Sequence, residues 1–264
     1  MTATAAMVER MEPARGSSEP APLLQVEGLT KAFGGLHAVE DCTFEVAPGS
    51  ITSLVGPNGA GKTTVFNLVS GLLAPSSGSV RFEGREVSGL APHKIVRSGV
   101  GRTFQITREL GELTVLENVI VNAPTHGLRA MLRGSVLHHE RDRALELLDL
   151  VGLTRVAHDL AKSLSYGQRK LLELAAVLMA DPRLVMLDEP AGGVNPRLIE
   201  DLMDLVGNLN RQGVTFLVVE HNMDVVMDMS DSIVVMAHGQ VVIQGTPEQV
   251  QTNDEVLDAY LGRS

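Results

Sequence analysis

The chain has few aromatic residues and an excess of acidic ones. Aromatic side chains make up 3% of its 264 residues, Trp is absent, and the formal net charge at pH 7 is −10. Proteins that bind single-stranded nucleic acid stack its bases on aromatic rings, and domains that bind duplexes are normally basic. The composition therefore predicts that nucleic acid is not a partner.

Cysteine and long hydrophobic runs are also scarce. Cys42 is the single cysteine, so no internal disulfide can form. The alternating residues 42–46 predict a strand in which Cys42 is a small buried side chain, with a reactive thiol as the alternative. No apolar stretch reaches the roughly 18 residues that cross a bilayer, and the beginning of the chain lacks the order of charges and apolar residues found in a signal peptide. We therefore expect a cytoplasmic protein that reaches a membrane only through a partner.

The pattern of residues changes along the chain. Residues 1–22 are rich in Ala, Pro, Ser and Glu, which predicts a disordered tail. After them, strand-like and helix-like segments alternate, with a helical stretch between about 106 and 167. This order predicts an α/β protein with a parallel-sheet core and a helical insert. The expected strands are 24–29, 43–46, 51–55, 79–82, 184–187, 214–219 and 233–236, and the main expected helices are 64–72, 92–98, 115–121, 141–151, 168–180, 196–211 and 222–229.

The most informative motif is a phosphate-binding loop. Residues 56–63 match the pattern G-x-x-x-x-G-K-[ST] at every fixed position, between the strand expected at 51–55 and the helix expected at 64–72. The glycines let backbone N–H groups face phosphate oxygens, Lys62 can reach the β- and γ-phosphates, and the Thr63 hydroxyl can ligate Mg²⁺. The sequence therefore predicts a nucleoside triphosphate site. The loop consists of Gly56, Pro57, Asn58, Gly59, Ala60, Gly61, Lys62 and Thr63.

Two carboxylates follow the buried strand expected at 184–187. Open α/β sheets bind ligands at the carboxyl ends of their strands. Asp188 suits coordination of Mg²⁺, directly or through water, and Glu189 suits a base that orients or deprotonates the attacking water. A solvated acidic turn before Pro190 is the alternative.

Residues 164–168 (Leu-Ser-Tyr-Gly-Gln) open the helix that precedes this strand. Ser165 suits the N-cap of that helix. A small hydroxyl and Gly167 at a helix N-terminus also suit a second phosphate cradle. Since one nucleotide does not need two cradles in one chain, this second one makes sense if it completes the site of another subunit.

These three motifs, in this order and spacing, resemble the ATP-binding subunit of an ABC transporter, and the resemblance covers about residues 23–264. It implies ATP and Mg²⁺ as cofactors and a P-loop NTPase fold. In that fold a parallel-sheet core carries an antiparallel β subdomain and an inserted helical subdomain. It also implies that ATP lies between residues 56–64 of one subunit, with Thr64 included, and Ser165, Gly167 and Gln168 of the other.

The resemblance assigns further residues. Gln105 resembles the glutamine that contacts Mg²⁺ or water and links to the membrane subunit, and His221 resembles the histidine that contacts the γ-phosphate. Phe33 is similar to the aromatic residue that stacks on adenine. From the sequence alone, a structural role for His221 and a core position for Phe33 remain alternatives. Asn195 stands where the family commonly has Asp, which leaves the role of that position open.

Residues 102–105, 113–119, 188–196 and 245–250 closely resemble LivG-type subunits, which energise import of branched-chain amino acids. Subunits of urea or amide importers and of lipid or lipopolysaccharide exporters are the alternatives. The implied partners are transmembrane permease subunits, a second ATPase subunit (an identical copy or a LivF-like one) and, indirectly, a solute-binding protein. The implied location is peripheral, at the cytoplasmic face of the cell membrane.

Two other classes of protein are alternatives to a transporter subunit. Soluble ABC proteins of ribosomes or DNA repair resemble tandem ATPase domains or domains split by long coiled coils, whereas this chain has one phosphate loop and no sustained heptads. A phosphotransferase acting on a small molecule would leave residues 164–168 unexplained. An ATPase that works as a dimer fits all the motifs.

Overall fold

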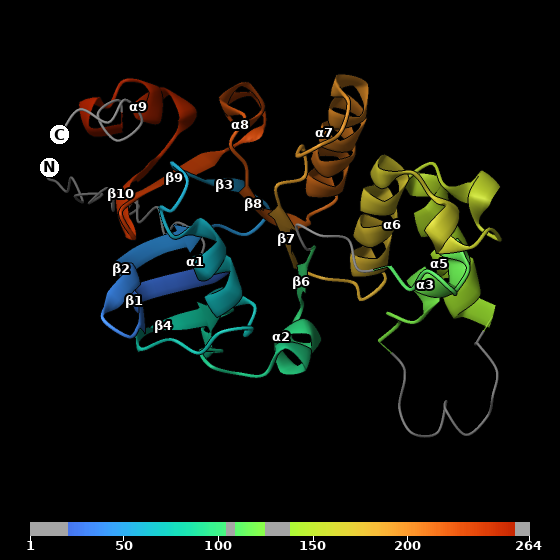
Figure 1. Ribbon diagram of the computed structural model, residues 1–264, viewed down its shortest axis with the longest axis horizontal. Coiled ribbons are helices and arrows are strands. Elements are labelled where there is room, and N and C mark those ends of the chain that lie inside the picture. The colour runs from blue at the N-terminus through green and yellow to red at the C-terminus, as the bar shows by residue number, and fades with distance from the viewer. Residues whose placement is uncertain (1–20, 104–108, 125–137, 257–264) are drawn as a thin grey trace, which may run out of the picture.

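The computed structural model describes residues 21–103, 109–124 and 138–256, in two sheets with surrounding helices (Figure 1). Residues 1–20, most of the predicted tail, lie outside this part. The strands are β1 (Leu24–Phe33), β2 (Leu36–Val46), β3 (Ile51–Val55), β4 (Ser77–Phe82), β5 (Arg85–Glu86), β6 (Val100–Arg102), β7 (Leu184–Asp188), β8 (Thr215–Val219), β9 (Ser232–Ala237) and β10 (Gln240–Gly245). The helices are α1 (Lys62–Val69), α2 (Pro92–Ser98), α3 (Val115–Ile120), α5 (His138–Leu150), α6 (Tyr166–Leu178), α7 (Pro196–Arg211), α8 (Met223–Met229) and α9 (Pro247–Gln251), with short 3₁₀ helices at Thr154–Val156 and Ala161–Ser163.

The larger sheet is the parallel core that the sequence predicts. Its strand order is β10-β9-β3-β8-β7-β6, in which β9, β3, β8, β7 and β6 are parallel and β10 is an antiparallel edge. Every residue of β3, β7 and β8 is buried, as expected for central strands of a parallel sheet that is covered on both faces. Parallel strands end at one edge of the sheet, so the loops that follow β3, β7 and β8 meet there.

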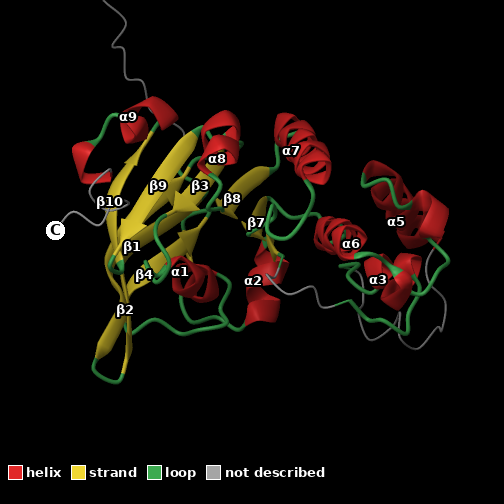
Figure 2. Cartoon of the chain, turned by 45° about the horizontal axis from the view of Figure 1, so that its top comes forward, coloured by secondary structure: helices red, strands yellow, loops and turns green. Residues whose placement is uncertain are grey.

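Side chains of this sheet alternate between two hydrophobic clusters. Leu184, Met186 and Leu217 pack with α1 and with the smaller sheet, whose order is β2-β1-β4-β5. Val185 and Phe216 point the other way and pack with α6 and α7. Successive residues of a strand face opposite sides, so both faces of β7 are anchored. Figure 2 shows α7 and α8 on one side of the sheet, with α1 on the other.

A helical lobe made of α3, α5 and α6 lies beside the β6–β7 end of the sheet (Figure 1). The helices expected at 115–121 and 141–151 correspond to α3 and α5. Thr114 starts α3 with a capping box, because its hydroxyl accepts from the N–H of Glu117 and the Glu117 carboxylate accepts from the N–H of Thr114. Buried apolar residues of α5 join α6 in one core with α7, so the lobe and the sheet share packing.

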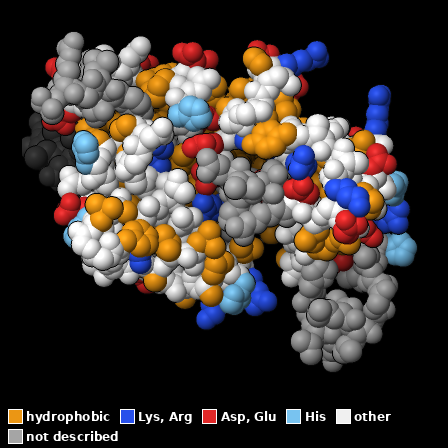
Figure 3. Space-filling model, viewed as in Figure 1, with side chains coloured by type: hydrophobic (Ala, Val, Ile, Leu, Met, Phe, Trp, Pro, Cys, Tyr) orange, Lys and Arg blue, Asp and Glu red, His pale blue; other side chains and the backbone are white. Residues whose placement is uncertain are grey.

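The surface mixes charges of both signs. On the face shown in Figure 3, Lys and Arg side chains of the described residues are interspersed with Asp and Glu and form no continuous basic patch. Among the residues that the structure describes, no helix has the length and apolar character needed to cross a bilayer.

Candidate functional site

The phosphate-binding loop joins β3 to α1, as the sequence predicts. Gly56, Gly59 and Gly61 have φ values of 149°, 83° and 100°, which side chains with a Cβ rarely adopt. An added Cβ would lie 2.1 Å from the carbonyl oxygen of Met236 at Gly56 and 2.6 Å from that of Ala38 at Gly61. The loop therefore needs glycine at Gly56 and Gly61 for space as well as for backbone freedom.

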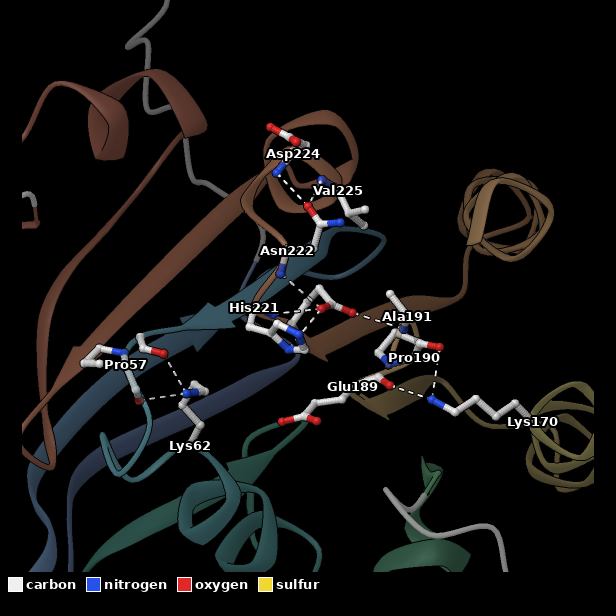
Figure 4. Close-up of polar contacts among 12 residues, drawn as sticks. Pro57, Lys62, Lys170, Glu189, Pro190, Ala191, His221, Asn222, Asp224 and Val225 are labelled. Atoms are coloured by element: carbon white, nitrogen blue, oxygen red, sulfur yellow. Dashed lines mark hydrogen bonds and ion pairs between the residues drawn. The ribbon is translucent and has the colours of Figure 1, made fainter. Parts of the chain in front are cut away.

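Lys62 is buried beneath this loop. Its Nζ donates to the carbonyl oxygens of Gly56, at 2.7 Å, and Pro57, at 3.0 Å (Figure 4). Burial lowers the pKa of Lys62, and the nearby charge of Glu189 opposes that shift. A cation held at the base of a loop of N–H donors is suited to bind phosphate oxygens.

Asp188 ends β7, with a side chain that is 3% exposed. A guanidinium nitrogen of Arg102 donates to Oδ2 of Asp188 at 2.9 Å. The backbone N–H of Asp188 donates to the hydroxyl of Thr103 at 3.3 Å. The carboxylate therefore has a fixed position at the carboxyl edge of the sheet, on the strand next to β8.

Glu189 has a backbone conformation that turns its side chain toward the phosphate-binding loop. Its φ is +49°, and its N–H donates to the carbonyl oxygen of Val219 at 2.9 Å. Its side chain lines the same open hollow as residues 58–64, and Figure 4 shows the carboxylate extending to the side where Lys62 lies. The loop, Asp188 and Glu189 thus meet at one edge of the sheet, which argues against a mere solvated turn.

Glu220 is a residue of this region that the sequence analysis did not single out. Glu220 is fully buried, and its carboxylate accepts from the N–H groups of His221 at 2.8 Å, Asn222 at 3.1 Å and Ala191 at 3.1 Å. It therefore ties the loop after β7 to the loop after β8. An acidic residue directly after the buried strand 215–219 was the available signal.

His221 follows Glu220 and faces outward. Its Nδ1 lies 3.4 Å from the Glu220 carboxylate, and its side chain is 63% exposed. Most of the ring is therefore open to solvent, and His221 does not line the hollow beside the phosphate-binding loop. Asn222, not His221, caps α8 through its side chain.

Phe33 is not a core residue, because it is 49% exposed at the end of β1. The Nζ of Lys31 lies 5.2 Å from the centroid of its ring. An exposed ring remains free to stack on a flat ligand. Gln105 lies outside the described residues.

The predicted second phosphate cradle, at residues 164–168, lies apart from the phosphate-binding loop. Ser165 is the N-cap of α6 and forms a capping box with Gln168, while Gly167 and Gln168 line a hollow together with residues 193–195. This hollow and the one beside the phosphate-binding loop share no lining residue in the part of the chain that the structure describes. The fold therefore separates Ser165 and Gly167 from Lys62 and Glu189.

Asn195 is the N-cap residue of α7. Its side chain accepts from the N–H of Leu198 at 2.9 Å and so caps α7. Asparagine is among the preferred N-cap residues, which explains why an uncharged side chain serves at this position.

A phosphate-binding loop, an acidic strand end, a helical lobe and a smaller antiparallel sheet define an ATPase of the ABC class. A model of the family described as ABC transporter matches residues 39–192, and one described as branched-chain amino acid ATP-binding cassette transporter matches residues 241–264. The chain belongs to the ABC transporter family and, within it, to the branched-chain amino acid (LivG/BraF) type of ATP-binding protein. This confirms the resemblance noted from the sequence.

Known proteins are similar to this chain over most of its length. The high-affinity branched-chain amino acid transport ATP-binding protein BraF of Pseudomonas aeruginosa is 43% identical over 252 residues, which cover 92% of this chain and 99% of BraF. A crystal structure of the ADP conformation of an ATP-binding cassette of an ABC transporter is 31% identical with a TM-score of 0.82, over 92% of this chain and 100% of that one. A dimeric post-hydrolysis cassette bound to ADP and Pi is 26% identical with a TM-score of 0.73, over 85% of this chain and 98% of that one.

Proposed function

We propose that this ABC transporter ATPase energises import of branched-chain amino acids from the cytoplasmic face of the membrane. The observation that carries the proposal is the 43% identity to BraF over 92% of this chain. The match of residues 241–264 to the branched-chain amino acid family model supports the same solute class. Residues 23–264 form the ATPase domain, with residues 106–167 as its helical insert and residues 1–22 as a tail.

ATP binds along residues 56–64, with its phosphates on the N–H groups of the loop and on Lys62, and its adenine on Phe33. Thr63 and Asp188, together with Gln105, would hold Mg²⁺. Hydroxyl and carboxylate oxygens are the hard ligands that Mg²⁺ prefers, and this ion usually takes its remaining ligands from phosphates and water. The ion, when bound there, would neutralise charge on the transferred phosphate.

Glu189 is the general base that orients or deprotonates the attacking water, and His221 contacts the γ-phosphate. The placement of the Glu189 side chain beside residues 58–64 supports its role. The exposed ring of His221, on a backbone fixed by Glu220, supports the second role.

The active unit is a pair of ATPase subunits, in which Ser165, Gly167 and Gln168 of one subunit close the site of the other. The separation of the two hollows in one chain supports this arrangement. The second subunit is a copy of this chain or a LivF-like relative. Permease subunits bind the helical lobe, and a solute-binding protein acts through them. Because only the γ-phosphate reaches both surfaces, its hydrolysis opens the pair.

The function is tested by deleting the gene and measuring uptake of labelled leucine, urea and other solutes. We expect loss of leucine, isoleucine and valine uptake with urea uptake intact. Wild-type protein should restore uptake, and Glu189→Gln should not. Lys94→Met is the control, because Lys94 is exposed on α2, outside the helical insert and the phosphate-binding loop. Loss of urea uptake alone, or full leucine uptake in the deletion strain, would contradict the proposal.

A further inference from the structure

Two side chains of α6, Tyr166 and Lys170, contact the loop that follows β7. Lys170 Nζ donates to the carbonyl oxygens of Glu189, at 2.8 Å, and Pro190, at 3.2 Å (Figure 4). The Tyr166 hydroxyl donates to the carbonyl oxygen of Gly192 at 3.4 Å. Residues four apart lie on one face of a helix, and Lys170 Nζ is 5.4 Å from the Tyr166 ring centroid. The two side chains therefore hold this loop together, from one face of α6.

The residue that Lys170 holds is in a conformation that needs support. Glu189 has a φ of +49°, which is unfavourable for a residue with a side chain. Its carbonyl oxygen accepts from Lys170 Nζ and also from the N–H of Gly192, at 3.0 Å. On its other side, its N–H donates to the carbonyl oxygen of Val219. Of these three hydrogen bonds to the Glu189 backbone, the one from Lys170 is thus the one made by a side chain.

The surroundings of Lys170 strengthen its bonds. It is partly buried, and burial lowers its pKa, while the nearby charges of Glu220, Glu173 and Glu189 oppose that shift and favour the charged form. Hydrogen bonds from a charged donor in such a partly buried site are stronger than neutral ones. A neutral side chain of similar length would leave the two carbonyl oxygens with a weaker partner or none from this helix.

We propose that Lys170 is a positioning residue for Glu189, assisted by Tyr166. This inference rests on the proposed function, in which Glu189 is the general base. Lys170 holds the backbone of Glu189 in the left-handed conformation that directs its carboxylate to the phosphate-binding loop. The N-terminal end of the same helix carries Ser165 and Gly167, which face the other subunit in the proposed pair. A displacement of α6 would therefore reach Glu189 through Lys170.

The first test measures ATP hydrolysis and ATP affinity of the assembled transporter with Lys170→Met. Misplacing a reacting group by about 1 Å costs up to about 100-fold in rate, so we expect kcat to fall about 10- to 100-fold. The Kd for ATP should stay within about twofold, since no group of the phosphate-binding loop is altered. Lys170→Arg, which keeps charged donors, should recover most of kcat. Lys94→Met is the matched control and should leave kcat unchanged, because Lys94 is exposed on α2, outside the helical insert and the phosphate-binding loop.

A second test asks whether Lys170 acts through Glu189. In single-turnover experiments, Lys170→Met should lower the rate strongly in the wild-type background and hardly at all in the Glu189→Gln background, because residues that act as a unit are not additive. Equal losses in both backgrounds would overturn the inference, as would wild-type turnover in Lys170→Met. If Lys170→Met does not fold, Lys170→Gln and Tyr166→Phe take its place, with the same non-additivity expected and smaller losses.

The same measurements separate the two proposals. If Glu189→Gln by itself hydrolyses ATP at a nearly normal rate, the base proposed above is wrong, whatever Lys170 does. If Glu189→Gln is inactive and Lys170→Met turns over normally, the proposed function stands and the positioning role of Lys170 is wrong.

Discussion

The guanidinium of Arg102 lies 2.9 Å from Oδ2 of Asp188, and the two side chains are only 7% and 3% exposed. Arg102 also donates to Asn67 at 2.8 Å and to the hydroxyl of Ser70 at 2.7 Å, both near the end of α1. This buried ion pair therefore ties the carboxylate at the end of β7 to the helix that follows the phosphate-binding loop. Because Oδ2 is taken by Arg102, the orientation of the whole carboxylate is fixed.

Arg102→Met should destabilise the protein by about 3–5 kcal/mol, because Asp188 would be left as a buried charge without that partner. Urea denaturation measures the change. Arg81→Met is the control, since Arg81 lies 3.8 Å from Glu27 and 3.7 Å from Glu86 in exposed pairs, and should cost within about 1 kcal/mol. The double variant Arg102→Met/Asp188→Asn should cost less than the sum of the single changes. Equal stability of the Arg102 and Arg81 variants would show that the buried pair is not important for folding.

Lys62→Ala should weaken ATP binding by about 10-fold or more, since hydrogen bonds to charged groups contribute about 1.5–3 kcal/mol. Competition against a fluorescent ATP analogue gives the Kd. Lys94→Ala, on the exposed side of α2, is the control and should bind as the wild type does. If Lys62→Ala bound ATP normally, the role of residues 56–63 as a phosphate cradle would be contradicted.

Much of the fold is visible in the sequence because its signals are local. The run 196–211 is amphipathic, and α7 has these bounds. Asn195, a favoured N-cap residue, precedes the run, and Pro196 is a favoured first residue of a helix. Every residue of the predicted strands 51–55 and 184–187 is buried, since the sheet is covered on both faces. The places of the two motifs in the fold could be predicted as well, because the phosphate-binding loop and Asp188–Glu189 lie at the ends of those strands.

Elements that depend on distant partners were missed. The strand β10 is only partly buried and owes its existence to pairing with β9, and the short strand β6 exists through pairing with β7. The ion pair of Arg102 with Asp188 joins positions 86 residues apart, and the bond of Lys170 to Glu189 joins positions 19 apart. No local pattern encodes such pairs, so only the three-dimensional structure identifies them.

Phe33→Ala should weaken ATP binding about 2- to 10-fold, as expected for the loss of one stacking contact of about 0.5–1.5 kcal/mol. The free energy of unfolding should hardly change, because the ring is 49% exposed. The same competition assay gives the Kd. Leu36→Ala is the control, since Leu36 pairs with Phe33 in the hairpin and is 70% exposed. Weakened affinity in both variants would point to the hairpin rather than to the ring.

The buried thiol of Cys42 should make stability fall at alkaline pH. Burial, with a smaller contribution from the charge of Asp41, raises the pKa of Cys42 from 9.0 to about 12. The unfolded chain therefore loses this proton near pH 9, while the folded chain keeps it until about pH 12. Stability from the protonated thiol is fully present below pH 9 and declines as the pH rises toward 12.

Comparison with Cys42→Ala isolates this effect from the titration of Lys and Tyr side chains, because both proteins share those groups. Between pH 7 and about 10.5, the wild type should lose about 2 kcal/mol more than the variant, from 1.36 kcal/mol per pKa unit. Urea denaturation at the two pH values measures both losses. Parallel losses in the two proteins would mean that the thiol ionises as readily in the folded chain as in the unfolded one, and that the interior around β2 admits a charge.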